Sequence, residues 1–537
     1  MSIQRTMKGL VFSLLIVVAQ FSQAENNRKN VLLIAVDDLK PLLGIYGADF
    51  MHTPNIDRLG KMGTVFMNNH CQVALCGPSR SSLMTGIYPD HANVYTMGQR
   101  LDDVRKRVPG LKTLPGYFKE KGYYSYGVGK LFDHRNTGPG QDKISWSLKS
   151  GVEWRWDSSL YEPTVNGYQN PQTKEKLSKT LKYLKKNKIA GNEKMLYFRK
   201  NSQLRPAYEV TEEIPDEAYA EGNFMAPLAI KNLRNQGRAY HKRGENFFVA
   251  VGFYKPHLPF NCPKKYFDLY DRNDFKVALN PNYPEGTSNI VEAPIIEARA
   301  FGFVPIEGEI PEETQIMLQM SYAACVSYVD AQIGKIMTVL EEENLWENTI
   351  VCLWGDHGFH LGDKSVFGKH TNYEQATRSP LILYSPEIDG NRKIEKTPTE
   401  LIDVFPTLCD LAGIEKPAVL DGDSLMDVMK GKTSKDPVAL SQYLRPYQGW
   451  ENDSMAMGYA IRDERYRYVE WRKSNRSAQN KKVWEKQSEV VLVELYDYEL
   501  DPLERVNLYT HPEYLNIVEK MQDKFDSKLS YLPPRKL

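Results

Sequence analysis

The sequence has few cysteines, almost no net charge and no long hydrophobic run beyond its first residues. Six cysteines in 537 residues are too few for a disulfide-stabilised scaffold. Its 69 lysines and arginines balance 68 aspartates and glutamates, and the net charge of +1 argues against a protein that mainly holds nucleic acid electrostatically. After residue 24 no apolar stretch reaches the ~18 residues of a membrane-spanning helix, so we expect no stable membrane span.

Residues 1–24 have the pattern of a signal peptide. Arg5 and Lys8 form a positive end, an apolar run follows from Gly9 to Ala19, and Ser22-Gln23-Ala24 is a small-x-small cleavage site. The alternative, a short membrane anchor, is disfavoured because the apolar run is too short to span a bilayer comfortably. We therefore expect the mature protein to be exported, to a periplasm or as a secreted protein.

The rest of the chain has a globular composition, with 41% hydrophobic and 26% charged residues. Three unbroken apolar runs, Asn30–Val36, Phe247–Phe253 and Thr349–Trp354, are typical of strands buried on both faces of a parallel sheet. Helical patterns lie between and after them, for example Glu313–Leu340 and Thr399–Ala412. Alternating strands and helices predict an α/β fold.

Each of these strands ends in residues that can bind a metal ion or an anion. Asp37-Asp38 follows the first strand, Lys255-Pro256-His257 the second, and Asp356-His357 the third. In open α/β sheets, ligands bind beyond the carboxyl ends of the strands. This coincidence is the first indication of a functional site.

Two regions depart from the alternating pattern. Residues 151–245 are rich in tyrosine at 155–170 and then in lysine, and we interpret them as an insertion, either a solvated helical one or a basic wall that attracts a polyanion. Farther along, the composition turns polar, and strand-like segments precede a last helix around 512–530. We therefore predict a main domain over 25–432 and a smaller C-terminal subdomain over 433–537.

The strongest local pattern is the segment from Ala74 to Gly86. Pro78 suits the first turn of a helix, so we expect Cys76 just before a helix N-terminus, where free N–H groups and the helix dipole favour anions. Arg80 adds a positive fork suited to a tetrahedral oxyanion. From the residues alone, Cys76 is either an activated cysteine at an anion site or a buried structural one. Cys262 stays unassigned, and the cysteines interpreted as structural are Cys71, Cys325, Cys352 and Cys409.

Cys76-x-Pro78-Ser79-Arg80, followed by Leu83-Met84-Thr85-Gly86, resembles the signature of the type I, formylglycine-dependent sulfatases. Other segments similar to family motifs occur in the expected order: Asp37-Asp38, Thr53–Leu59, Gly122–Lys130, Gly355–Gly358, and Leu495–Asp497 with Val506–Leu508. Within the family, Lys255–Phe260 and Gly368–Asn372 are most similar to the iduronate-2-sulfatase branch. The resemblance implies an alkaline-phosphatase-like α/β sandwich, with a large mixed, mostly parallel sheet between helices and a smaller C-terminal α+β subdomain.

The resemblance also implies a cofactor and a modified residue. Cys76 would be oxidised to formylglycine by a formylglycine-generating or equivalent maturation enzyme, and its hydrate would be the nucleophile, stabilised by Arg80. The implied metal ligands are Asp37, Asp38, Asp356 and His357, together with the oxygen of the modified Cys76. Mainly hard oxygen ligands suit Ca²⁺ rather than zinc, with Mg²⁺ as the less expected ion.

The remaining roles follow from the same resemblance. Lys130 and Lys369 would hold the sulfate oxygens, and His257 would be the general acid that protonates the leaving sugar oxygen. The alternative for His257 is a histidine merely fixed in a proline-rich turn. The family places its base just after the second-signature lysine, where this sequence has Asp133, so His134 is favoured for that role and Asp133 stays open.

The predicted function is hydrolysis of sulfate esters on a sulfated oligo- or polysaccharide. The branch resemblance points to a glycan that contains uronic acid, either a glycosaminoglycan or an algal polysaccharide such as ulvan, with exo-action favoured over attack within the chain. One alternative is a phosphonate or phosphate diester hydrolase of the same superfamily. Another is a non-catalytic binder of sulfated glycans in which Cys76 stays a thiol.

Overall fold

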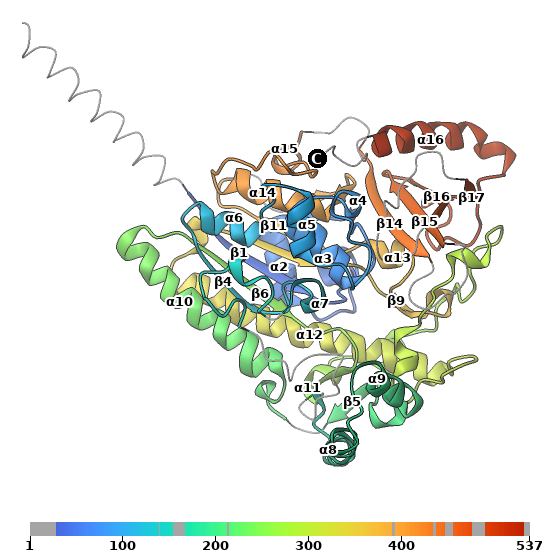
Figure 1. Ribbon diagram of the computed structural model, residues 1–537, viewed down its shortest axis with the longest axis horizontal. Helices are drawn as coiled ribbons and strands as arrows, with labels where there is room; N and C mark the ends of the chain where they lie inside the picture. The colour runs from blue at the N-terminus through green and yellow to red at the C-terminus, as the bar shows by residue number, and fades with distance from the viewer. Residues whose placement is uncertain are drawn as a thin grey trace, which may run out of the picture.

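The computed structural model describes residues 28–138, 140–153, 167–211, 214–388, 393–432, 437–445, 455–474 and 489–530. The predicted signal peptide and most of the tyrosine-rich segment 155–170 lie outside these residues. Within them, no helix combines the length and apolarity needed to cross a membrane. Figure 1 shows a main body with a central sheet between helices, and a second sheet at one end that carries the last helix.

The three predicted apolar strands form the centre of a seven-stranded sheet. β1 (Asn30–Val36) runs parallel to both of its neighbours, β6 (Phe247–Phe253) and β8 (Thr349–Gly355). Every residue of these strands is buried, as the unbroken apolar runs predict. The order is β12-β2-β11-β8-β1-β6-β4, with β2 at Thr64–Phe66, β4 at Tyr124–Gly129, β11 at Leu381–Tyr384 and β12 at Lys393–Glu395. Because β11 runs antiparallel to β8 and β2, the sheet is mixed and mostly parallel, as predicted.

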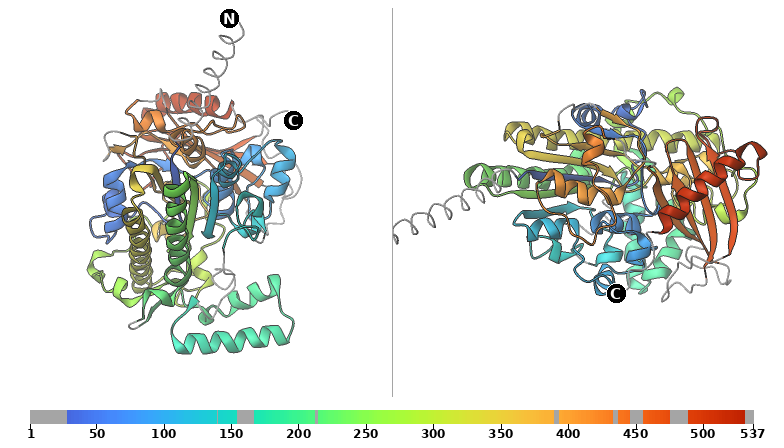
Figure 2. Two further views of the ribbon diagram at one scale, coloured as in Figure 1. Left: turned by 90° about the vertical axis from the view of Figure 1, so that its left-hand side faces the viewer. Right: turned by 90° about the horizontal axis from the view of Figure 1, so that it is seen from above.

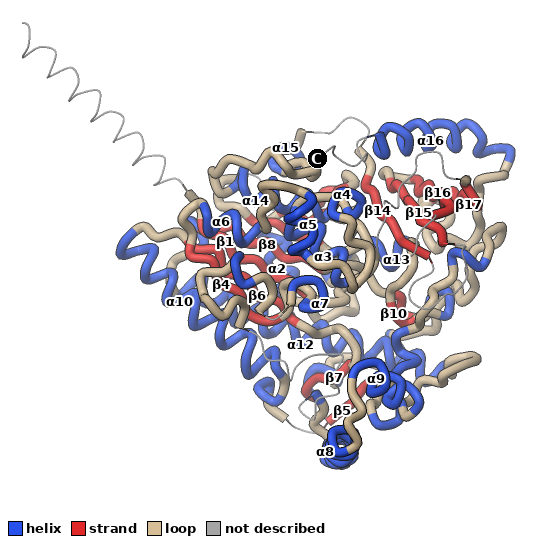
Figure 3. Tube along the Cα trace, in the orientation of Figure 1, coloured by secondary structure: helices blue, strands red, loops and turns tan. Residues whose placement is uncertain are grey.

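The side chains on the two faces of β1 belong to different hydrophobic cores, since side chains alternate along a strand. Leu32 and Ile34 belong to one core, and Val31 and Leu33 belong to the other. The helices over the first face are α2 (Pro54–Met62), α10 (Ala226–Arg243) and α12 (Glu312–Glu342), and those over the second are α3 (Cys76–Thr85), α6 (Leu114–Glu120) and α14 (Val404–Leu411). Figure 3 shows the strands enclosed by these helices. The predicted helix Glu313–Leu340 is confirmed as α12.

The predicted helix 399–412 begins later than expected. Thr399–Glu400 is instead the short strand β13, which pairs with β3 (Asn69–His70), and a 3₁₀ turn precedes α14. The side chains of Glu400 and Asp403 cap each other's backbone N–H groups, which ends the extended segment. The other short elements are α4 (Pro89–Ala92), α5 (Leu101–Arg107), α7 (His134–Thr137), α11 (Lys264–Phe267), α13 (Glu374–Thr377), α15 (Met426–Met429), β9 (His360–Leu361) and β10 (Phe367–Gly368).

Residues 151–245 contain an exposed helix pair and, after it, a segment that packs against the main body. α8 (Pro171–Lys186) and α9 (Gly191–Lys200) form an exposed pair that lies clear of the main body in Figure 2. Next, β5 (Tyr208–Thr211) pairs in parallel with β7 (Phe260–Pro263). The last helix of the range, α10, packs against the central sheet through Ala229 and Leu233. Only the exposed pair therefore has the character of a surface insertion.

The C-terminal part is an antiparallel sheet covered by one helix. Its strands are β14 (Ala439–Arg445), β15 (Met455–Arg462), β16 (Tyr466–Ser474) and β17 (Val490–Asp497), in sequence order. α16 (Leu515–Ser530) packs onto this sheet through Met521 and Phe525. The side chain of Glu374 in the main body accepts a hydrogen bond from Arg462 Nε at 3.3 Å and so ties the two parts together. This arrangement is the predicted C-terminal α+β subdomain.

Candidate active site

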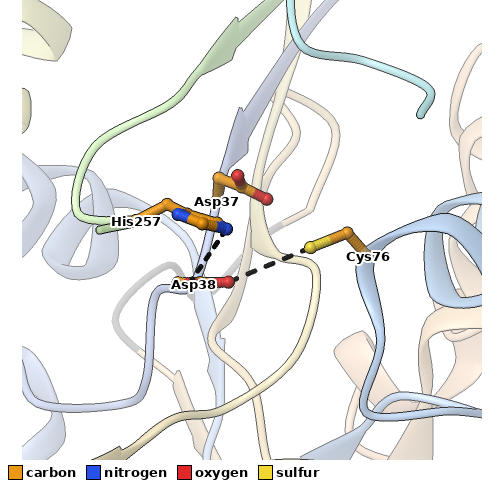
Figure 4. A group of neighbouring side chains, drawn as sticks. All are labelled: Asp37, Asp38, Cys76 and His257. Atoms are coloured by element: carbon orange, nitrogen blue, oxygen red, sulfur yellow. Dashed lines mark hydrogen bonds and ion pairs between the residues drawn. The ribbon is translucent and has the colours of Figure 1, made fainter. Parts of the chain in front are cut away.

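The carboxyl ends of β1, β6 and β8 meet the N-terminus of α3. Asp37 and Asp38 follow β1, His257 follows β6, and Cys76 is the first residue of α3 (Figure 4). Ligand atoms of these four side chains all lie within 4.8 Å of one another. A second group, of three residues within the same distance limit, joins Cys76 to Asp356 and His357 after β8, so the two groups share Cys76. The predicted metal ligands therefore share one buried site; His257 also joins the first group.

Cys76 opens α3 rather than preceding it, since Leu75 is the N-cap residue. Its Sγ atom lies 3.3 Å from His357 Nε2 and 4.0 Å from Asp38 Oδ1. Burial and the nearby Asp37 carboxylate raise the pKa of the Cys76 thiol well above its usual range. This direction is opposite to that of an activated thiolate, so for the unmodified residue it favours the alternative of a buried thiol over a cysteine activated by the helix N-terminus.

Gly77 explains how the chain beside Cys76 can pack so closely. A Cβ atom on this residue would lie 2.0 Å from Asn136 Oδ1 and 2.5 Å from Met97 Sδ. Only glycine leaves room for α7 against the first turn of α3. This contact brings the segment that carries His134 beside the start of the helix that carries Cys76.

Arg80 is fully buried and joins two of the carboxylates. It donates from Nε to Asp356 Oδ2 at 2.9 Å and from Nη2 to Asp37 Oδ1 at 3.0 Å. Its Nη1 donates to the backbone carbonyls of Lys130 and Leu131 at 2.6 and 3.2 Å. The planar guanidinium thereby fixes the ends of three strands relative to α3, a task that suits its rigid fork of donors.

Two lysines pair with the first two carboxylates. Lys130 Nζ donates to Asp37 Oδ2 at 2.6 Å, and Lys369 Nζ donates to both oxygens of Asp38 at 2.7 and 3.0 Å. Although burial raises the pKa of Asp37, Lys130 and Arg80 more than offset it and hold that pKa well below its usual range. For Asp38 burial outweighs Lys369, so its pKa is raised. A bound cation would reverse this by favouring the charged carboxylate.

The backbone of Asp38 has a left-handed conformation, with φ of 59°. Its N–H donates to Asp356 Oδ1 at 3.0 Å, and its carbonyl accepts from the Tyr322 hydroxyl at 2.8 Å. Aspartate tolerates this conformation better than most residues. The two hydrogen bonds therefore hold the turn that directs both carboxylates into the site.

The two histidines of the site are oriented in the same way. Each Nδ1 faces the carbonyl of the following residue at 2.9 Å: Leu258 for His257, and Gly358 for His357. The Nε2 atoms face Asp38, at 3.7 Å from its Oδ2 for His257 and 3.5 Å from its Oδ1 for His357. Burial lowers the pKa of His257 to about 3 and that of His357 to about 4. Both rings are therefore neutral near pH 7.

Asp133 and His134 lie at the start of α7 and differ in their partners. Both oxygens of Asp133 accept from Arg135, at 2.7 Å from Nε and 2.6 Å from Nη2. Although burial opposes it, Arg135 holds the pKa of Asp133 below its usual range. Burial lowers the pKa of His134 to about 4. His134 is thus neutral and able to accept a proton, while Asp133 is engaged with a cation.

Glu297 was missed by the sequence analysis. It lies in a 3₁₀ turn, η10 (Glu297–Ala300), and its carboxylate lies 3.0 Å from Lys369 Nζ and 3.4 Å from His370 Nε2. Lys369 therefore sits between Glu297 and Asp38. An isolated acid in irregular chain, far from Lys369 in sequence, belongs to no motif, so no sequence signal marks it.

The other five cysteines belong to neither of the two groups of potential metal ligands in the described residues. All six are buried, and none forms a disulfide in the described parts of the chain. Burial raises the pKa of Cys71 and Cys352 above the usual range of a thiol. The structure therefore supports the interpretation of the four cysteines in apolar stretches as structural and adds Cys262 to them.

Comparison with known proteins gives consistent matches along the chain. A profile of the Sulfatase family matches residues 29–414, and one described as N-sulphoglucosamine sulphohydrolase, C-terminal, matches residues 362–530. Iduronate 2-sulfatase of Mus musculus is 30% identical, over 96% of this chain and 98% of that protein. A sulfatase of Formosa agariphila is 29% identical, over 93% and 87% of the two chains. The structure of a phosphonate monoester hydrolase from Silicibacter pomeroyi has a TM-score of 0.67 at 20% identity, covers 95% of this chain and 97% of its own, and is similar in fold.

Proposed function

This chain belongs to the sulfatase family, near its iduronate 2-sulfatase branch, and is a sulfuric ester hydrolase; we propose that it removes sulfate from a glycan that contains uronic acid. A glycosaminoglycan or an algal polysaccharide such as ulvan has this chemistry. The similarity to iduronate 2-sulfatase supports a sulfated uronate as the residue attacked. We further propose exo-action, with the sulfated sugar at the end of the chain.

One observation carries the proposal: Cys76 opens a helix at the point where four carboxylates and three buried cations converge. The formal charges of Asp37, Asp38, Asp356, Glu297, Arg80, Lys130 and Lys369 sum to −1. A divalent cation would bring the cluster to +1, which complements the single negative charge of a sulfate ester. A phosphate monoester carries up to two negative charges, so the charge balance favours sulfate.

The residues present fit the metal that such enzymes use. Asp37, Asp38, Asp356 and His357 would hold it, and three carboxylates supply the hard oxygen donors that Ca²⁺ prefers. Bound there, a divalent cation draws charge from sulfate oxygens and lowers the pKa of a nearby hydroxyl. Cys76, oxidised to formylglycine by a maturation enzyme, would supply that hydroxyl as the nucleophile.

The two lysines and His257 would act on the substrate. Lys130 and Lys369 already lie at the carboxylates of Asp37 and Asp38, so a sulfate bound beside these acids would meet two ammonium groups where negative charge grows. His257 would donate a proton from Nε2 to the leaving sugar oxygen, because its Nδ1 is turned to a backbone carbonyl. Its pKa of about 3 must rise for this role, and an incoming anionic sulfate acts in that direction.

His134 is the proposed base that completes the cycle by accepting a proton near Cys76. Its neutral ring supports this choice over Asp133, whose two oxygens are engaged with Arg135. The proposal also includes export of the mature protein after removal of residues 1–24. The domain limits at 25–432 and 433–537 remain predictions.

The test is sulfate release by mature protein co-produced with a formylglycine-generating enzyme. We expect release from a disaccharide with a 2-O-sulfated uronate at its end, and much slower hydrolysis of a phosphonate monoester and a phosphate diester. A Cys76→Ala variant is the control and should release no sulfate. Faster hydrolysis of the phosphorus esters would favour the alternative hydrolase, and glycan binding without any release would favour a non-catalytic binder.

A further inference from the structure

The exposed helix pair α8–α9 carries the most concentrated charge in the chain. Residues 171–200 contain ten cationic side chains and two acidic ones, Glu175 and Glu193. The cations are Lys174, Lys176, Lys179, Lys182, Lys185, Lys186, Lys188, Lys194, Arg199 and Lys200. The pair therefore has a net charge of +8, and subtracting it from the chain's +1 leaves −7 for all other residues.

The geometry of α8 separates its lysines from its packing face. Leu177 and Leu184 are buried against Tyr168 and Phe198 in a small core of their own. At 3.6 residues per turn, Lys179, Lys182 and Lys186 lie on the face of α8 opposite these leucines and Lys176 lies beside it, and all four are exposed. One acidic residue, Glu175, pairs with Lys179 at 2.6 Å. A surface that only needed solubility would interleave both signs of charge, whereas this face is almost entirely positive.

The helix pair is built onto the two segments that flank the active site. β5, after α9, pairs with β7, which begins at Phe260 just beyond His257. Arg205 Nη2, also after α9, donates to the carbonyl of Ala300 at 2.8 Å. Ala300 ends η10, the turn whose first residue, Glu297, pairs with Lys369. The segments that hold the helix pair, β7 and η10, thus lie next to His257 and contain Glu297, so the pair is attached close to the active site.

An exposed aromatic residue lies among the lysines. Tyr183 of α8 is 52% exposed and its ring centroid lies 6.2 Å from that of Tyr197 on α9. Tyrosine offers a flat apolar face with a polar end and is a frequent contact residue at binding surfaces. In the left view of Figure 2 the pair projects from the main body, so a long ligand can reach this face.

We infer that the α8–α9 face is a secondary binding surface for a sulfated glycan chain. It holds sugars beyond the one whose sulfate is removed, so that the enzyme prefers long anionic chains to single sulfated units. The identity of the chain as a sulfated glycan rests on the proposed function. The physical argument is charge complementarity: repeated sulfates and carboxylates oppose a row of lysines, which increases local substrate concentration and releases counterions on binding.

The test compares two sets of four substitutions with the same change in charge. In the first, Lys176, Lys182, Lys185 and Lys186 are changed together to Gln; none of them pairs with an acid in the described parts of the chain. In the matched control, Lys61, Lys242, Lys430 and Lys520, which are exposed and lie outside the pair, are changed to Gln. Circular dichroism verifies that both proteins keep their helices.

Binding is measured with a twelve-sugar heparin fragment in the Cys76→Ala background, so that it does not depend on turnover. We expect the first set to weaken binding about tenfold at low salt and to reduce its salt dependence, while the control changes it by less than about twofold. Sulfate release from a disaccharide by the Cys76-containing enzyme should change less than about twofold in both sets.

Three results would overturn the inference. Equal losses in both sets would show a general charge effect, and unchanged binding in the first set would show that the face is not used. Tighter binding of single-stranded DNA or phosphatidylglycerol vesicles than of the heparin fragment would assign the face to another partner. Absence of sulfate release from any substrate would contradict the proposed function and leave the binding comparison intact.

Discussion

Replacement of Arg80 by lysine should show how far the hydrogen bonds of the guanidinium, rather than its positive charge, hold the active site together. The guanidinium donates to two carboxylates, Asp356 and Asp37, and to two backbone carbonyls, all without solvent exposure. Lysine keeps the charge but not the fork, so at least two of these four bonds are lost. A hydrogen bond to a charged group contributes about 1.5–3 kcal/mol, and breaking a buried pair costs about 3–5 kcal/mol. We therefore expect Arg80→Lys to lose about 3–5 kcal/mol of stability.

Urea unfolding of the calcium-free proteins measures this loss, and a calcium titration of sulfate release measures its effect on the site. Carboxylates that are no longer held in place should bind calcium about 10–100-fold more weakly. Arg465→Lys is the matched control, because Arg465 also holds a carboxylate through two bonds, to Asp497 at 2.8 and 2.6 Å, but is 37% exposed. It should cost less than about 1 kcal/mol. The reasoning would be refuted if both variants lost the same free energy of unfolding and the calcium concentration needed for sulfate release stayed unchanged.

Four further predictions follow from the same contacts. Glu374 is buried beside Arg462, which overcomes the effect of burial and lowers its pKa from 4.5 to about 2. The ionised carboxylate contributes about 3 kcal/mol to stability above pH 4.5, and this contribution is lost as the pH falls toward 2. The urea midpoint of Glu374→Gln should therefore fall less between pH 4.5 and pH 2 than that of the wild type. An equal fall of the midpoint in both proteins would contradict this. Gly77→Ala places a Cβ 2.0 Å from Asn136 Oδ1, so we expect it to lose about 1–3 kcal/mol of stability and most of the activity. The control is Gly98→Ala, whose Cβ would have its nearest atom at 3.7 Å. It should match the wild type in thermal melting and in sulfate release. Glu297→Gln weakens the restraint on Lys369 and should lower kcat about tenfold with little change in the melting midpoint; an unchanged kcat would remove Glu297 from the site's machinery. Removal of divalent ions by a chelator should abolish sulfate release, and calcium should restore it better than magnesium; full activity in the chelator would exclude the metal.

The parts of the fold that sequence reasoning predicted are those encoded locally. The strands that precede Asp37, His257 and Asp356 are unbroken apolar runs, a pattern that few other structures accommodate. Parallel packing then brings their ends together, so the carboxylates and His257 could be placed in one site. Cys76 and Arg80 lie in one short motif at a helix start, and the structure joins them to the same strands.

The parts that were missed depend on long-range contacts. Glu297 and Tyr322 reach the site from segments without a motif, and only the folded chain places them at Lys369 and Asp38. The late start of α14 follows from the pairing of Thr399 with Asn69, a partner far away in sequence. The raised pKa of the Cys76 thiol could not be predicted from the sequence, because the helix N-terminus is a local feature, while burial and the Asp37 carboxylate are properties of the assembled site.

We propose that Cys76 supplies the nucleophile only after its oxidation to formylglycine. The most direct test is mass spectrometry of the peptide that contains residue 76, from protein of the native source or co-produced with a formylglycine-generating enzyme. We expect an aldehyde or its hydrate at this position, in proportion to the sulfate released by each preparation. A thiol throughout, from cells that convert a reference substrate of the same maturation enzyme, would contradict it.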